Sequence, residues 1–92
     1  MNDETWHILF YEYVEDMAER RGPHRDAHLA HIRAARDAGK ITQAGALGDP
    51  LHGGALVFRG CEPSEIEAFA AEDPYMRAGL ITGWRVEPWK LV

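Results

Sequence analysis

The stretch from Thr5 to Val14, TWHILFYEYV, most constrains the fold, because it has aromatic and apolar side chains on both faces of a predicted strand. Aromatic and β-branched residues favour β-strands, and successive side chains of a strand point to opposite faces of its sheet. The two faces carry Trp6, Ile8 and Phe10 on one side and His7, Leu9, Tyr11 and Tyr13 on the other. Each face therefore needs another layer to cover it, because a large exposed apolar patch is a liability.

A long helix is predicted after this strand. EDMAERRGP forms a polar connection, and Gly22-Pro23 then starts a helix, because proline is tolerated in a first helical turn. The helix should run to about Ala38, where Gly39 provides a C-terminal stop. Residues 40–47 form a second predicted strand.

The second half of the chain repeats this alternation. A loop rich in Gly and Pro spans residues 48–54, and a short apolar strand follows in GALVFRG. Ser64 with Glu67 resembles a capping box, which predicts a second helix ending at about Glu72. Asp73-Pro74 then breaks and restarts the chain, since Asp is a good N-cap and Pro a good first helical residue. A short helix ending at Gly79 and a last strand, 82–92, complete the prediction.

The resulting order is βαββαβ, with a short helical extension before the last strand. A four-stranded antiparallel sheet with both helices on one face, the ferredoxin-like α+β arrangement, satisfies this order and the right-handed crossover rule. We expect a single domain over residues 1–92. Two helices cover only one sheet face, and a second copy of the chain is the simplest cover for the other. The sequence thus predicts a homodimer packed sheet against sheet.

Composition narrows the classes of partner. The 92 residues carry a formal charge of −5, which argues weakly against a phosphate-neutralising nucleic-acid surface. The basic run Arg20-Arg21 with Arg25 is either a patch for one anionic small molecule or a solvated helix entrance. The single cysteine, Cys61, excludes an internal disulfide and is consistent with a reducing compartment. No apolar run approaches the length that spans a bilayer, so we expect a cytoplasmic protein without membrane contact.

Three histidines stand out in the first helix. In HRDAHLAHI, His24, His28 and His31 lie four and then three residues apart, which places them on one face of a helix. Ala27, Ala34 and Ala38 lie beside this stripe, and it is predicted to pack inward. The opposite arc, predicted to face solvent, contains Arg25, Arg33, Arg36, Asp26 and Asp37, with Leu29 near its boundary.

Three roles are open for these histidines. An inward imidazole often makes one or two hydrogen bonds and has no further function. Histidines at i and i+4 can also share a metal ion, but one helix does not easily supply three ligands to a tetrahedral centre, and no Cys or HExxH-type partner is nearby. We therefore expect no metal ligand among these residues. Acid–base chemistry is the third role, and it needs a carboxylate that orients the imidazole.

Asp73 is the best candidate for that carboxylate. The break at Pro74 takes Asp73 out of helical geometry, and a ferredoxin-like fold returns this segment towards the first helix. An N-cap role would explain Asp73-Pro74 without any catalysis. From the residues alone, the pairing of His28 with Asp73 is a guess.

The chain resembles the YciI-like (YCII-related) family over nearly its whole length. The resemblance is carried, in order, by Arg25-x-Ala27-His28-Leu29, Gly39, Ala44-Gly45, Asp73-Pro74-Tyr75-x-x-Ala78-Gly79 and Pro88-Trp89. Each motif alone is weak, but their order and spacing together are fairly specific. The resemblance implies a ferredoxin-like domain of the dimeric α/β-barrel type. It also implies an active site centred on His28 and Asp73, with Arg25 and Tyr75 lining the same pocket.

The resemblance leaves some positions without a role. His24 and His31 do not match the family motif. The family usually has Gly-Pro after the second strand, where this chain has Gly45-Ala46, and this change is expected to alter the pocket wall. His52, in the following loop, either enters the pocket or faces water, and we favour water.

Two functions follow as expectations. The first is a small-molecule enzyme of lyase, dehydrochlorinase or isomerase type, in which His28 and Asp73 transfer a proton. In the family that the chain resembles, one relative removes chloride from a chlorinated hydroxyquinol. No redox cofactor is expected, because the sequence has no glycine-rich dinucleotide fingerprint and no reactive thiol pair. The alternative is a non-catalytic ligand-binding or accessory module with the same pocket.

Overall fold

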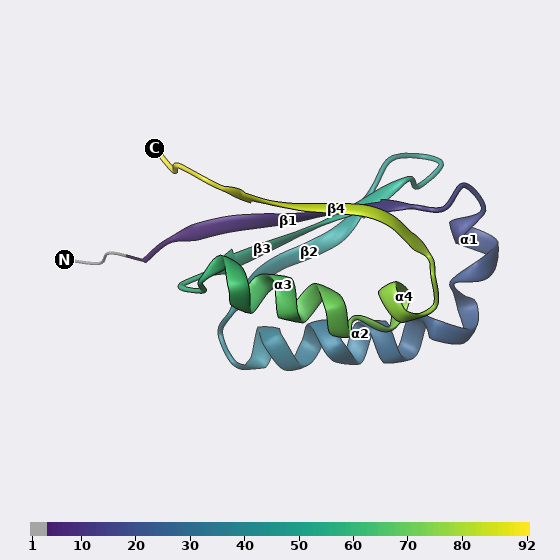
Figure 1. The fold of residues 1–92 in the computed structure, drawn as a ribbon, viewed down its shortest axis with the longest axis horizontal. Helices are drawn as coiled ribbons and strands as arrows, with labels where there is room; N and C mark the ends of the chain where they lie inside the picture. Colours follow the sequence, from purple (N-terminus) through teal and green to yellow (C-terminus); the bar gives the residue numbers. More distant parts are fainter. Residues whose placement is uncertain (1–3) are drawn as a thin grey trace.

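The computed structural model describes residues 4–92 and contains one four-stranded antiparallel sheet with all its helices on one face (Figure 1). The strands are β1 (Trp6–Tyr13), β2 (Ile41–Leu47), β3 (Gly53–Arg59) and β4 (Ile81–Pro88). Their spatial order is β2-β3-β1-β4, so both central strands are those predicted to be the most apolar. The predicted ferredoxin-like α+β fold is confirmed.

The helical layer is formed by two long and two short helices. These are α1 (Met17–Arg20), α2 (Gly22–Asp37), α3 (Pro63–Glu72) and α4 (Pro74–Arg77). In Figure 1, α2, α3 and α4 lie below the sheet, and α1 lies at the end where β1 turns into α2. The stops at Gly39 and Gly79 are as predicted, since both have positive φ, 79° and 75°, which glycine adopts without steric cost.

The core lies between the helices and the inner face of the sheet. Leu9 of β1 pairs with Leu56 of β3, and Tyr11 pairs with Gly54, so these side chains share the inner face. A Cβ on Gly54 would lie 2.7 Å from the hydroxyl oxygen of Tyr13. The glycine therefore leaves room for the ring of Tyr13 beneath the sheet.

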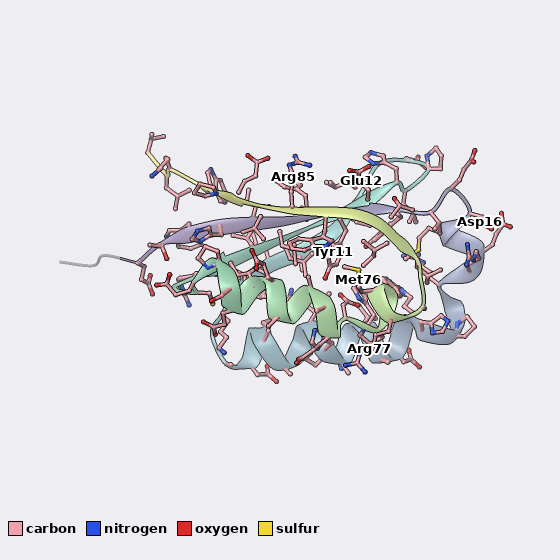
Figure 2. The ribbon with its side chains drawn as sticks, viewed as in Figure 1. Tyr11, Glu12, Asp16, Met76, Arg77 and Arg85 are labelled. Carbon is pink, nitrogen blue, oxygen red and sulfur yellow. The ribbon has the colours of Figure 1, made fainter. Side chains whose placement is uncertain are left out.

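The outer face of the sheet is not covered by any part of the described chain (Figure 1). Ile8 and Phe10 of β1 are partly buried there, beside Val57 of β3. The guanidinium carbon of Arg85 lies 4.2 Å from the centre of the Phe10 ring, and Figure 2 shows Arg85 on the side of the sheet away from the helices. This surface matches the two-faced apolar pattern of the first strand.

Two local predictions are wrong. The connection before α2 contains the short helix α1, which is anchored by the fully buried side chain of Met17, an apolar residue in an otherwise polar stretch. Ser64 does not form a capping box: Pro63 is already the first helical residue, so the N-cap is Glu62, and no side chain caps the helix. Ser64 is thus inside the first turn, where its hydroxyl cannot act as the cap.

Strand limits also differ slightly from the predicted ones. β3 begins at Gly53, inside the predicted loop, and β4 ends at Pro88, before the predicted Val92. Directly after Pro88, the backbone N–H of Trp89 still donates to the carbonyl oxygen of Trp6 at 2.8 Å. No helix in residues 4–92 is both long and apolar enough to cross a membrane, and the cytoplasmic location stays a prediction.

Candidate active site

The structure brings His28 and Asp73 into direct contact, although 45 residues separate them in the chain. The Nδ1 atom of His28 lies 2.8 Å from Oδ1 of Asp73, with both side chains buried. A carboxylate accepts hydrogen bonds, so Nδ1–H donates, and the lone pair of the neutral ring is then on Nε2. No other hydrogen bond to His28 exists among residues 4–92, which leaves Nε2 without a protein partner.

The Asp73 carboxylate is held in place by three donors. Besides His28, the backbone N–H of Tyr75 donates to Oδ1 at 2.9 Å, and the hydroxyl of Tyr11 donates to Oδ2 at 3.0 Å. The first of these is the predicted N-cap contact of α4. Asp73 is 0% exposed, so the three hydrogen bonds compensate for the removal of a charge from water.

Asp73 thus combines the two roles that the sequence left open. Its backbone has extended geometry, φ −64° and ψ 127°, because the following proline disfavours a helical residue before it. This geometry ends α3, starts α4 and turns the side chain towards α2. The N-cap contact uses one lone pair of Oδ1, and the same oxygen remains available to His28.

Tyr11 is a member of the site that the sequence analysis missed. Figure 2 shows its side chain pointing from β1 into the space between sheet and helices, where its hydroxyl contacts Asp73. Burial, together with the Asp73 charge, raises the pKa of the Tyr11 phenol far above its usual value. The sequence signal for Tyr11 is its position two residues after Leu9, which places both side chains on the inner face of the strand. A buried tyrosine hydroxyl usually has a hydrogen-bond partner.

Tyr75 forms one wall beside the imidazole. Its ring stacks on that of His28 with centroids 3.7 Å apart and planes within 8°. Burial raises the pKa of the Tyr75 phenol, while the charges of Arg21 and Arg25 and a hydrogen bond from Arg25 oppose the rise. Tyr75 and Arg25 therefore both line the pocket next to His28.

These residues open onto a cavity of about 310 Å³ between α2 and β2. Its lining comprises Tyr13, Arg21, Arg25, His28, Leu29, Ile32, Arg33, Arg36, Ala44, Gly45, Ala46, Leu56 and Tyr75. The cavity is large enough for a small organic molecule. Since His28 lines it, the unpartnered Nε2 is the ring atom that a bound molecule can reach.

The arginines of α2 combine exposure with a place at the cavity. Arg25, Arg33 and Arg36 are exposed, as predicted for this arc, and all three also line the cavity. The reason is that β2 extends beyond the core and forms a second wall beside this arc. Gly45 and Ala46, where the chain departs from the usual Gly-Pro, both belong to that wall.

The three histidines of α2 have three different surroundings. His28 contacts Asp73, whereas Nε2 of His31 lies 2.9 Å from the carbonyl oxygen of Phe69. His24 is partly buried beside Pro74 and Arg77. His52 is exposed and does not line the cavity, in line with the prediction that it faces water.

The inward stripe is narrower than predicted. Ala27, Ala34 and Ala38, expected beside the histidines in the packed face, are exposed. In the part of the chain that the structure describes, no three His, Cys, Asp or Glu side chains are grouped so that they could hold a metal ion.

The fold and this cavity define a class of ferredoxin-like α+β proteins with a pocket between the sheet and the helical layer. Within that class, the chain belongs to the family of the YCII-related domain, whose model matches residues 5–90. Protein YciI of Escherichia coli O6:H1 is 34% identical to it over 97 residues, which cover 92% of this chain and 99% of that protein. Protein YciI of Shigella flexneri matches equally well.

Solved structures show the same fold at lower identity. The 5-chloro-2-hydroxyhydroquinone dehydrochlorinase of Burkholderia phenoliruptrix AC1100, solved with 2,5-dihydroxybenzoquinone, matches with a TM-score of 0.80 and 23% identity over 95% of each chain. A dimeric ferredoxin-like protein of unknown function from Thermobifida fusca matches with a TM-score of 0.53 and 11% identity, covering 96% of this chain and 91% of that one. Both likenesses concern the fold.

Proposed function

We propose that this chain is a small-molecule enzyme in which His28 exchanges a proton with the substrate and Asp73 orients the imidazole. The reaction is of lyase, dehydrochlorinase or isomerase type and needs no redox cofactor. The observation that carries the proposal is the two-sided environment of the His28 ring. Nδ1 is bound to a fully buried carboxylate, and Nε2 has no protein partner at the wall of a 310 Å³ cavity.

This environment suits a general base. The Asp73 carboxylate fixes the tautomer that has a lone pair on Nε2, and it stabilises the imidazolium formed when that lone pair takes a proton. The three donors to Asp73 hold the carboxylate in one orientation, so little reorganisation accompanies the transfer.

The proposed step conserves atoms and electrons without an external oxidant or reductant. The Nε2 lone pair of His28 takes a proton from a C–H or O–H bond of the substrate, and the electron pair of that bond remains on the substrate. In an isomerase this pair moves into a conjugated system and the proton returns at another atom. In a lyase it forms a new π bond while a leaving group, such as chloride, departs with its own electron pair.

Arg25 and Tyr75 are proposed to bind the charge that develops on the substrate. The guanidinium of Arg25 lines the cavity close to Tyr75, whose ring stacks on His28. A guanidinium and a phenol O–H are suitable donors to an enolate, phenolate or carboxylate oxygen. The dehydrochlorinase with the same fold, solved with a quinone, supports a small oxygenated ring as one substrate class.

Proton exchange with solvent tests this proposal directly. Purified protein is incubated in deuterium oxide with small hydroxylated aromatics and keto acids, including 5-chloro-2-hydroxyhydroquinone. Proton NMR then follows deuterium incorporation, and a chloride electrode follows chloride release. We expect the wild-type chain to act on at least one compound that the His28→Gln variant binds but does not convert.

Binding measurements distinguish an enzyme from a non-catalytic ligand-binding module. A compound that stabilises the protein in a thermal-shift assay but is never exchanged or converted would favour the non-catalytic ligand-binding module. Equal conversion by the wild-type chain and His28→Gln would contradict the role of His28. An Asp37→Asn variant is a suitable control, since Asp37 is an exposed acid at the end of α2 and does not line the cavity.

We also propose that the outer face of the sheet binds a second copy of the chain. Ile8, Phe10 and Val57 form an apolar strip on this face, and no described residue from the helices reaches it. The solved structure from Thermobifida fusca is described as a dimer. Gel filtration should give a dimer for the wild-type chain and a monomer for Ile8→Asp, with Ser64→Asp on the helical side as control. A wild-type monomer at micromolar concentration would contradict this arrangement.

A further inference from the structure

The strongest unexplained feature is the charge of the cavity. Four arginines, Arg21, Arg25, Arg33 and Arg36, line it together with His28, and no Asp or Glu is among its lining residues. The chain as a whole has a formal charge of −5. A cationic hollow in an acidic protein concentrates anions near the site and repels cations.

These arginines are not used by the protein itself as ion-pair partners. The ion pairs of residues 4–92 that involve arginine are made by Arg20, Arg59 and Arg85. Of the four cavity arginines, Arg21 and Arg25 lie close enough to Tyr75 for their charges to lower the pKa of its phenol. The others have no acidic partner in this part of the chain, so their charges are available to a bound molecule.

The arginines are arranged at two ends of one helical stripe. Arg25, Leu29, Ile32 and Arg36 are spaced i, i+4, i+7 and i+11 along α2, and therefore follow one another on the same face. The stripe begins and ends with a cation and is apolar in its middle. The axial rise from His28 to Arg36, eight residues, is about 12 Å, and from His28 to Arg33 about 7 Å.

The opposite wall is narrow and uncharged. It is formed by Ala44, Gly45 and Ala46 of β2, and a Cβ on Gly45 would meet no atom within 4 Å. Small residues here leave room for a flat or extended molecule along α2. Neither wall supplies a carboxylate that would compete for the arginines.

We propose that the cavity takes an elongated anion, with a reacting ring at His28 and a carboxylate or similar acidic group bound by Arg33 and Arg36. This rests on the proposed function for its reacting end, and it makes Arg33 and Arg36 specificity-determining residues. The apolar middle of the ligand lies against Leu29 and Ile32, and its acidic end lies one to two helical turns from His28. Neutral analogues of the same skeleton bind more weakly.

Matched pairs of probes test the inference. The probes are 4-hydroxybenzoate and 4-hydroxycinnamate, each compared with its uncharged methyl ester by isothermal titration calorimetry at fixed ionic strength. Charge-assisted hydrogen bonds to the acid should make at least one carboxylate bind about tenfold more tightly than its ester. In the Arg33→Gln/Arg36→Gln double variant this preference should disappear.

The control variant removes two positive charges that lie outside the cavity. Arg20 and Arg77 do not line the cavity, and Figure 2 shows Arg77 on the helical side of the molecule, away from the sheet. The Arg20→Gln/Arg77→Gln variant should retain the preference, which excludes an effect of net charge alone. Circular dichroism establishes that each variant is folded, and Arg33→Lys/Arg36→Lys should restore part of the preference.

The outcomes distinguish this inference from the proposed function. His28→Gln should keep the preference for the carboxylate even though it stops proton exchange. Equal affinities for acid and ester, a preference that survives in Arg33→Gln/Arg36→Gln, or no binding of either carboxylate would overturn the inference. A carboxylate preference without proton exchange in the wild-type chain would support the inference and contradict the proposed function.

Discussion

His28 and His31 lie on the same helix, three residues apart, and each stacks on an aromatic ring, yet they have different partners. His28 stacks on Tyr75 at 3.7 Å and contacts the Asp73 carboxylate, whereas His31 stacks on Phe69 at 4.1 Å and contacts the Phe69 carbonyl oxygen. A carboxylate stabilises an imidazolium, while a neutral carbonyl mainly fixes ring orientation. The partner, more than the histidine, decides which ring is suited to proton transfer.

The hollows beside the two rings also differ in the charges that line them. Next to His31, a second hollow of about 360 Å³ between α2 and α3 is lined mostly by alanines and by Phe58, Phe69 and Cys61. Its cation, Lys40, lies 2.7 Å from Glu65 and is neutralised within the protein. The cavity at His28 instead has four arginines and no acidic lining residue. The two sides of α2 therefore offer a matched comparison of a charged site and a structural one.

The largest expected effect is on catalysis by His28. His28→Gln should lower kcat by about 10²–10⁴-fold, the usual contribution of a positioned general base. The His31→Gln variant should remain within a few-fold of the wild-type chain, because its ring has no carboxylate partner. Turnover of a substrate found in the exchange screen measures both. Similar losses in the two variants would remove the distinction drawn here.

Removal of the Asp73 carboxylate should produce the largest loss of stability. Asp73→Ala leaves the Tyr11 hydroxyl, the Tyr75 N–H and the His28 Nδ1–H without their acceptor, which we expect to cost about 3–5 kcal/mol. Asp73→Asn should cost less, since the amide oxygen still accepts hydrogen bonds. Urea unfolding measures each value, with Asp37→Asn as the control for an exposed acid. A loss below about 1 kcal/mol in Asp73→Ala would show that the network contributes little.

The tyrosines of the site should all titrate above their ordinary pKa, both in the buried network and at the cavity wall. Burial raises the pKa of the phenols of Tyr11 and Tyr75, and burial together with the charges of Tyr75 and Asp73 raises that of Tyr13 to about 12. These are the three tyrosines of the chain. The folded protein should therefore show little phenolate absorbance as the pH passes 10, the ordinary tyrosine pKa.

The same shift makes stability depend on alkaline pH. Between about pH 10 and 12, unfolded tyrosines lose protons that the folded chain keeps, so the unfolded state is favoured as pH rises. The contribution is fully present below pH 10 and is lost as pH rises towards 12. Urea unfolding across this range should show a smaller decline in Tyr13→Phe, which has no proton to lose. A normal phenolate titration near pH 10 in the folded state would contradict this account.

Local chemistry made much of the fold predictable. The strand at residues 5–14, the helix that starts at Gly22-Pro23 and the N-cap at Asp73 each depend on residues close together in the chain. Met17 was missed because one apolar residue in a polar segment carries no periodicity. Ser64 was misread because the capping-box pattern does not specify which residue begins the helix.

The site could be predicted only in part, because it depends on distant segments. From the residues, the pairing of His28 with Asp73 is a hypothesis, and the family resemblance implies both as site residues. Tyr11 requires knowledge of which core tyrosine faces the carboxylate. For Arg33 and Arg36 the helical pattern correctly predicts exposure, because it distinguishes the buried face of a helix from the exposed one. It does not reveal that the edge strand β2 extends past the core to wall a cavity beside the exposed face.

The smallest expected effect is on stability at His31, and it tests how far a stacked histidine without a carboxylate contributes. His31→Gln removes the ring contact with Phe69 and the hydrogen bond to its carbonyl oxygen, which together should cost about 1 kcal/mol. Urea unfolding at pH 7 gives this value, and His52→Gln, at an exposed histidine, is the control. A loss comparable to that of Asp73→Ala would mean that the Phe69 carbonyl anchors α2 to α3 as firmly as the buried carboxylate anchors α2 to α4. In that case the charge of the partner would govern only the chemistry of the ring and not the stability that its contact provides.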